Sequence, residues 1–283
     1  MNLNRNERTV EKCLFEAKKE LKTSGAQEYA LDCDLFMMKS TSLSKIQLFT
    51  KKDYVLSDEE YDNFVSMVER RKTGEPCQYI TGKAYFFDRE FFVNSNVLIP
   101  RNDTEILVET VIEYGKKHGF KTMLDIGTGS GCIAISLALE GFEMTAVDIS
   151  EGALETAKKN AEFNEAKVEF INSNVFSGVE GRKFDAIVSN PPYIEKDVIP
   201  TLMRDVKDFE PMGALDGGED GLFFYRQIVD EGRNHLNKGG FIFFEIGYNQ
   251  GEAVKELFEE KGYTEARIIK DLAGLDRVVL AKF

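Results

Sequence analysis

The sequence predicts an α/β protein in which a mostly parallel sheet, covered by helices on both faces, follows a small helical bundle. After residue 100, short apolar runs alternate with helical segments, as in sheets with crossover helices. One of these runs, residues 123–126, passes through a glycine-rich turn into a helix-like segment. Residues 1–73 show helical periodicity instead. With 283 residues, 42% of them hydrophobic, the chain can build a large core in one or two domains.

The first 73 residues are predicted to form a bundle. Val10, Leu14, Ala17 and Leu21 recur three or four residues apart, which marks one helix face. Two further apolar stripes are Leu31, Leu35 and Met38, and Leu43, Ile46 and Leu48. Ser57, followed three residues later by Glu60, is a capping box that begins another helix. Such stripes are far more typical of a bundle core than of a cofactor pocket.

The rest of the chain divides into a linker and a larger domain. Residues 74–100 are predicted to form a linker containing a β-hairpin at 86–93. Residues 101–283 then form the α/β domain. Its last two runs, 266–269 and 277–280, are expected to make an antiparallel hairpin at the end of the sheet.

A glycine-rich turn and an acid suggest a nucleoside site. The turn consists of Gly127, Thr128, Gly129, Ser130 and Gly131. Its glycines allow close approach of a ligand, and the amides of the following helix start attract polar or anionic groups. The spacing G-x-G-x-G misses the dinucleotide fingerprint by one residue. Asp148, which ends the next run, can accept both hydroxyls of a ribose.

The tetrapeptide Asn190-Pro191-Pro192-Tyr193 follows a buried strand-like run, residues 184–189. The prolines fix φ and remove two backbone donors, and Pro191 biases Asn190 toward an extended conformation. The Asn190 amide and nearby backbone carbonyls therefore face outward. They can accept both hydrogens of a planar NH2 group, with the Tyr193 ring against its plane. An ordinary proline-rich turn is the alternative for this motif taken alone.

The chain contains the glycine loop, Asp148 and the tetrapeptide in this order. In this combination it resembles the S-adenosylmethionine-dependent methyltransferases that act on planar NH2 groups. Further segments narrow the resemblance to one family. They are GEPCQYITG at 74–82, VLIPR at 97–101, TE at 104–105, DIGTGSG at 125–131, EP at 210–211, ALDGG at 214–218, DG at 220–221, KDLAG at 270–274 and DR at 276–277. From about residue 74 to its end, the chain resembles the HemK (PrmC) family of peptide chain release factor glutamine N5-methyltransferases.

This resemblance implies a class I, Rossmann-like methyltransferase fold with S-adenosylmethionine as cofactor and S-adenosylhomocysteine as product. It implies that residues 127–131, Asp148 and Asn190 bind the cofactor. Asn190, Pro191 and Tyr193 would be catalytic and, together with Pro192, would bind the substrate glutamine. That glutamine belongs to the Gly-Gly-Gln tripeptide of bacterial class I release factors, which the helical domain, residues 1–73, would dock.

The chain departs from the family pattern after its third strand-like run, residues 168–171. Many members carry an acid where this chain has Asn174 and a large aromatic residue where it has Val175. Both positions would border the adenine. Val175 is therefore a candidate cofactor-binding residue, and its neighbour Phe176 is a second candidate for the apolar surface.

The expected reaction is a direct in-line displacement, in which the protein mainly aligns nucleophile and methyl group. An amide nitrogen is a poor nucleophile because its lone pair is delocalised. The Asn190 side-chain oxygen and the Pro191 backbone carbonyl would accept its two hydrogens and localise charge on nitrogen as the bond forms. A strong base is not required, because the nitrogen becomes acidic once it is methylated.

Three other classes of protein share parts of this pattern. A nucleic-acid adenine-N6 methyltransferase has the same tetrapeptide, but the formal charge of −13 argues against binding through phosphate contacts. A non-catalytic nucleoside-binding module leaves the tetrapeptide without a role. A nucleotide-dependent dehydrogenase is disfavoured by the glycine spacing.

Composition also bounds location and metal chemistry. No run approaches the ~18 apolar residues of a membrane span, and residues 1–5 lack a signal-peptide core, so we expect a cytoplasmic protein. The four cysteines have no C-x-x-C or zinc spacing and are expected to be reduced and mostly buried, although the helix start near Cys132 can lower its pKa. The isolated His118 and His235 are expected at the surface, and no metal site is expected.

Overall fold

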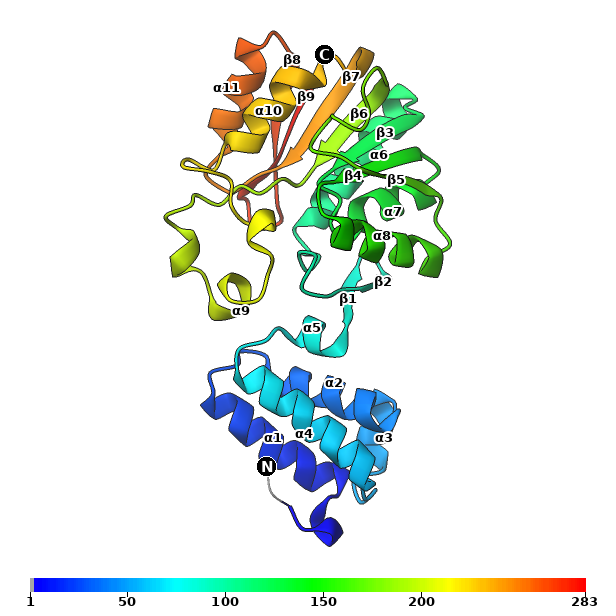
Figure 1. Ribbon diagram of the computed structural model, residues 1–283, viewed down its shortest axis with the longest axis vertical. Coiled ribbons are helices and arrows are strands. Elements are labelled where there is room, and N and C mark those ends of the chain that lie inside the picture. The colour runs from blue at the N-terminus through cyan, green and yellow to red at the C-terminus, as the bar shows by residue number, and fades with distance from the viewer. Residues whose placement is uncertain (1–2) are drawn as a thin grey trace. The chain divides into compact units, whose positions relative to one another are not determined.

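The computed structural model describes residues 3–283, which fall into two compact units (Figure 1). The first unit contains the described residues up to Gly82 together with Arg204–Phe209, and the second contains Lys83–Met203 and Glu210–Phe283. Residues 1 and 2 of the predicted helical domain lie outside the described residues. Within the described chain, no helix is both long enough and apolar enough to cross a bilayer.

The first unit is a helical bundle. Its elements are the 3-10 helix η1 (Arg5–Glu7) and the α-helices α1 (Val10–Thr23), α2 (Tyr29–Thr41), α3 (Lys45–Thr50), α4 (Asp58–Lys72), α5 (Cys77–Thr81) and α9 (Arg204–Lys207). The predicted capping box is present: Ser57 accepts from the Glu60 amide, and Glu60 accepts from the Ser57 amide. Helix α5 packs against α2 and α4, so it belongs to the bundle, although sequence analysis assigned it to the linker.

The core of the bundle uses some faces that the sequence did not indicate. On α1, Val10, Ala17 and Leu21 are fully buried, as predicted. On α2, however, the buried face carries Phe36 and Met37, whereas Leu31 is 45% exposed. Apolar side chains lie on several faces of α2, and packing in the bundle buries the face that carries Cys33, Phe36 and Met37.

The second unit contains a seven-stranded sheet with the order β5-β4-β3-β6-β7-β9-β8. The strands are β3 (Thr122–Ile126), β4 (Glu143–Asp148), β5 (Val168–Asn172), β6 (Phe184–Ser189), β7 (Leu236–Glu245), β8 (Thr264–Lys270) and β9 (Asp276–Lys282). Strands β3 to β7 are parallel, and β9 is antiparallel to both β7 and β8. The predicted parallel sheet with a C-terminal antiparallel hairpin is confirmed.

Helices cover both faces of this sheet (Figure 1). They are α6 (Thr104–His118), α7 (Cys132–Leu139) and α8 (Glu151–Phe163) on one face, and α10 (Phe223–Gly232) and α11 (Gly251–Glu260) on the other. Along β7, Phe241 and Phe243 pack into the first core and Ile242 and Phe244 into the second, as the alternation of side chains in a strand requires. The short 3-10 helices η2 (Ile199–Thr201) and η3 (Met212–Ala214) lie between β6 and α10.

The predicted hairpin consists of β1 (Lys83–Phe86) and β2 (Arg89–Phe92). Its turn is at Phe87 and Asp88, which have φ values of 49° and 58°. Positive φ at both central residues is the type I′ geometry that suits a two-residue hairpin.

The cysteines and histidines lie partly where they were predicted. All four cysteines are free and buried. Burial raises the pKa of Cys132 to about 12, so the nearby helix start does not activate this thiol. His118 is exposed at the end of α6. His235 is buried, and its ring is stacked on Phe176 at a centroid distance of 4.4 Å, so the expectation of a surface position was wrong. The reason is that His235 immediately precedes β7, where the chain enters the second core.

Candidate active site

Three adjacent strands bring the sequence motifs to one edge of the sheet. Ile126 at the end of β3 lies beside Val147 of β4 and Ser189 of β6. The glycine loop, Asp148 and Asn190 therefore follow strands that end at the same level. In parallel sheets, ligands bind at this carboxyl edge.

A cavity of about 390 Å³ lies at this edge, and all of its lining residues belong to the second unit. Nine of the predicted site residues line it: Gly127, Thr128, Gly129, Ser130, Asp148, Val175, Asn190, Pro191 and Pro192. Gly131 and Tyr193 are not among the lining residues. The volume is in the range of small-molecule sites.

The three glycines of the loop have different surroundings. Gly127 and Gly129 have φ values of 72° and 55°, and a Cβ on either would meet no atom within 4 Å, so this side of the loop is an open cradle. Gly131 has a φ of 81°, and a Cβ there would lie 3.0 Å from Ile135 and 3.1 Å from Ala157. Its lack of a side chain allows α7 to pack closely on α8.

Asp148 is oriented by the backbone around it. Its Oδ2 accepts from the Gly129 amide at 2.9 Å, and its Oδ1 accepts from the Ser150 amide at 2.9 Å. A carboxylate oxygen has a second lone pair. Asp148 therefore fixes the glycine loop and still has acceptor capacity for a ligand hydroxyl.

Asp125 is a buried acid to which sequence analysis gave no role. It is fully buried in β3, and its Oδ2 accepts from the Thr128 hydroxyl at 2.6 Å, while Oδ1 has no partner among the described residues. Burial raises its pKa to about 7. A single acid inside an apolar strand was the signal that could have revealed it.

Val175 lines the cavity in an unusual conformation. Its φ is 51°, which is rare for a β-branched residue and strained. Hydrogen bonds hold the loop in this shape, since Ser173 Oγ donates to the Val175 carbonyl at 2.9 Å and accepts from the Gly178 amide at 2.8 Å. Phe176 packs on His235 and is not among the lining residues.

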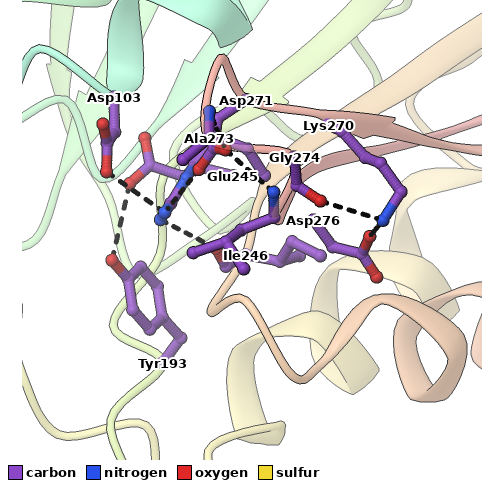
Figure 2. Close-up of polar contacts among 11 residues, drawn as sticks. Asp103, Tyr193, Glu245, Ile246, Lys270, Asp271, Ala273, Gly274 and Asp276 are labelled. Carbon is purple, nitrogen blue, oxygen red and sulfur yellow. Dashed lines mark hydrogen bonds and ion pairs between the residues drawn. The ribbon is translucent and has the colours of Figure 1, made fainter.

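The tetrapeptide presents its residues in different directions. The Asn190 amide donates through Nδ2 to Thr104 Oγ1 at 3.3 Å, and Pro191 and Pro192 line the cavity. The Tyr193 hydroxyl instead donates to Oε1 of Glu245 at 3.5 Å (Figure 2). Burial, followed by the charge of Glu245, raises the pKa of Tyr193 well above its usual value, so this residue is a neutral donor.

The backbone that follows Pro192 is held by close contacts. Gln250 Nε2 donates to the Tyr193 carbonyl at 3.0 Å. A Cβ on Gly217 would lie 2.7 Å from the Tyr193 Cα, and one on Gly221 would contact the Tyr193 carbonyl oxygen. The glycines at 217 and 221 are therefore needed where this connection passes the tetrapeptide.

An ion pair ties two walls of the cavity together. Arg101 Nη2 lies 2.6 and 2.7 Å from the two carboxylate oxygens of Glu210, which is 6% exposed. Arg101 lines the cavity, and so does Pro211, the neighbour of Glu210. The connection between β6 and α10 is thereby joined to the segment that precedes α6.

The strand order and the site together define a class I methyltransferase. A methyltransferase from Pyrococcus furiosus has a similar fold, with a TM-score of 0.53 and 21% identity, over 78% of this chain and 98% of that one. Two family models match the chain, the PrmC N-terminal domain over residues 12–82 and the methyltransferase small domain over residues 101–205.

Relatives over nearly the whole chain identify the family. A release factor glutamine methyltransferase from Clostridium botulinum is 41% identical over 275 residues, which cover 95% of this chain and 97% of the relative. One from Koribacter versatilis is 40% identical over 277 residues, which cover 97% and 98%. The chain belongs to the family of release factor glutamine methyltransferases.

Proposed function

We propose that this protein transfers a methyl group from S-adenosylmethionine to the side-chain amide N5 of a glutamine in peptide chain release factors. The glutamine would be that of the Gly-Gly-Gln tripeptide in bacterial class I factors. The observation that carries this proposal is that the glycine loop, Asp148 and the Asn-Pro-Pro segment line the same cavity. Such a substrate acts in translation, so the proposed location is the cytoplasm.

The residues of the cavity fit the cofactor. The open cradle at Gly127 and Gly129 would receive its methionine end, since no protein atom fills the space that a side chain would occupy. Asp148 would accept from the ribose hydroxyls with its remaining lone pairs. Val175 offers an apolar surface for the adenine. When bound, S-adenosylmethionine supplies a methyl group already activated by the sulfonium charge.

The protein's part in the reaction is to orient the substrate amide. Because Asn190 donates through Nδ2 to Thr104, its Oδ1 is the end left to accept an N–H of the glutamine. The Pro191 carbonyl would accept the other N–H. Prolines at 191 and 192 contribute no backbone donor that would compete for these acceptors. The two glycines before the glutamine would let the tripeptide enter without a side-chain clash.

The helical unit would dock the body of the release factor. In support, α3 exposes two large apolar side chains, Ile46 at 75% and Phe49 at 64%. The two residues are three positions apart and therefore lie on one face of the helix, where they could contact another protein together. Docking at α3 would add recognition beyond the tripeptide.

Transfer of labelled methyl from S-adenosylmethionine to an intact class I release factor tests the proposed activity. Mass spectrometry should find one added methyl group on the Gly-Gly-Gln glutamine. Asn190→Ala should slow transfer by ~10²–10³-fold, the usual cost of losing one such acceptor, with most of the cofactor affinity retained. Label in DNA adenine, with the factor unmodified, would favour a nucleic-acid methyltransferase instead.

The docking role has its own test. The double variant Ile46→Ala with Phe49→Ala should raise the KM for intact factor and leave transfer to a short Gly-Gly-Gln peptide unchanged. Equal effects on both substrates would contradict docking at α3.

A further inference from the structure

A buried carboxylate lies behind the tetrapeptide. Glu245, the last residue of β7, is 1% exposed, and one of its oxygens, Oε2, has no hydrogen-bond partner among the described residues. Burying a carboxylate without an ion pair is costly. The groups around Glu245 show how its charge can be stabilised.

Polar and charged groups from several elements of the second unit surround Glu245. Asp103 and Thr104 lie at the start of α6, Tyr193 follows β6, Tyr225 comes from α10 and Arg277 from β9. Cys132 of α7 is also close enough to sense the charge. Burial raises the pKa of Glu245 to about 7, while Thr104, Arg277 and Asn190 favour the ionised form.

Arg277 does not neutralise Glu245 by direct pairing. Its Nη2 lies 3.1 Å from Asp103 and 3.2 Å from Asp271, and its Nη1 donates to the Ile246 carbonyl at 3.4 Å. Figure 2 shows Asp103, Asp271 and Ile246 with these contacts as dashed lines. The two Nη atoms of the guanidinium are therefore held by other partners, while its buried Nε has no hydrogen-bond partner among the described residues. The donors nearest to the Glu245 carboxylate otherwise come from side chains of the active site.

An ionised carboxylate can only accept hydrogen bonds. Tyr193 donates to Oε1, and Thr104 and Asn190 are close enough to favour the ionised form as donors. The Thr104 hydroxyl accepts from Asn190 Nδ2 at 3.3 Å, so its own proton is free to point toward the carboxylate. The donors then run in one direction, from Asn190 through Thr104 to Glu245.

We propose that ionised Glu245 is a positioning residue, which sets the direction of this donor chain and keeps Asn190 Oδ1 turned to the cavity. This inference rests on the proposed function, because it assigns Oδ1 as the acceptor for the substrate amide. A glutamine at position 245 would offer an NH2 group as well as an oxygen. That donor can pair with Asn190 Oδ1, and the Asn190 amide would then turn its own NH2 toward the substrate NH2.

The variant Glu245→Gln keeps the shape of the side chain and tests the proposal directly. We expect kcat to fall about 10²-fold, as for other losses of a preorganised acceptor, with the cofactor Kd within twofold of wild type. Glu169→Gln on β5, which removes the charge of a residue paired with Arg182 at 2.7 Å, is the matched control and should be fully active. A Glu245→Gln rate within twofold of wild type would overturn the proposal, as would a parallel loss of cofactor affinity.

Exchanging the two side chains supplies a second, independent readout. In Asn190→Asp alone, two carboxylates lie near each other and transfer should be slow. In the double variant Glu245→Gln with Asn190→Asp, the new glutamine NH2 can donate to one oxygen of the new carboxylate, and the other oxygen of that carboxylate faces the substrate. We expect the exchange to recover at least tenfold over Asn190→Asp, and no recovery would refute the assigned direction.

The pH dependence separates positioning from a merely structural role. The wild-type kcat should rise with pH through about 7 as Glu245 ionises, and Glu245→Gln should lack this rise. An unchanged rise in Glu245→Gln would place the ionisation at another group, such as Asp125, and contradict the proposal. Wild-type protein that methylates no release factor would refute the proposed function, whereas active wild type with an equally active Glu245→Gln refutes only this inference.

Discussion

Replacing Asp148 by alanine should weaken cofactor binding through the ribose. A hydrogen bond to a charged acceptor contributes about 1.5–3 kcal/mol, and each 1.4 kcal/mol is about tenfold in affinity. Losing one hydroxyl contact therefore predicts a roughly ten- to hundredfold increase in the Kd for S-adenosylhomocysteine. The variant also removes the acceptor for the Gly129 and Ser150 amides, so the glycine loop loses a support.

Calorimetry with two ligands distinguishes the ribose contact from loop support. Wild-type protein should bind S-adenosylhomocysteine more tightly than an analogue that lacks both ribose hydroxyls, and Asp148→Ala should bind the two equally. Asp185→Ala is the matched control, because Asp185 accepts from the Lys121 and Thr122 amides at 2.8 and 3.1 Å, at the opposite edge of the sheet. The assignment fails if Asp148→Ala still discriminates between the ligands as wild type does.

Two further perturbations probe the loop and the buried acid. Gly131→Ala should lower the free energy of unfolding by roughly 2–5 kcal/mol, because it combines left-handed strain with crowding against Ala157. Gly129→Ala lies in open space and should cost only the strain of ~1–2 kcal/mol. Equal costs in urea denaturation would contradict this packing role of Gly131. The raised pKa of Asp125 means that its stabilising contribution is present below its unfolded pKa near 4 and is lost as pH rises toward about 7. Asp125→Asn should therefore become more stable relative to wild type as pH increases from about 5 to 8, by at most about 4 kcal/mol. If the difference in thermal unfolding between the two proteins does not change with pH, ionisation of Asp125 is not linked to stability.

Local patterns in the sequence predict the elements of the sheet but not their order. The runs around 123–126, 184–189 and 241–246 are apolar because both faces of the parallel sheet are covered by helices. Such continuous apolar runs can be recognised from the sequence. The placement of β9 between β7 and β8 depends on contacts between distant segments. Similarly, the choice of buried face on α2 was decided by packing, which exposes Leu31.

Within the site, the backbone motifs were easier to anticipate than the side chains behind them. The sequence predicts the glycine loop, Asp148 and Asn190 because strand ends and turn residues mark them. It also predicts that the Tyr193 ring lies against the substrate amide; in the structure the Tyr193 hydroxyl points to Glu245. Glu245 itself was missed, because an acid in an apolar run can be explained only when its three-dimensional neighbours are known.

The order of the strands also has a consequence for how the protein folds. Strands β3 and β6 are neighbours, yet Ile126 and Ser189, which share a hydrogen bond, are 63 residues apart in sequence. Long loops must close before such parallel pairs gain stability, which makes them slow to form. The glycine loop and Asp148 follow earlier strands, whereas residues 190–192 reach the cavity only when β6 docks. In refolding experiments, methyl transfer should therefore recover later than helix content.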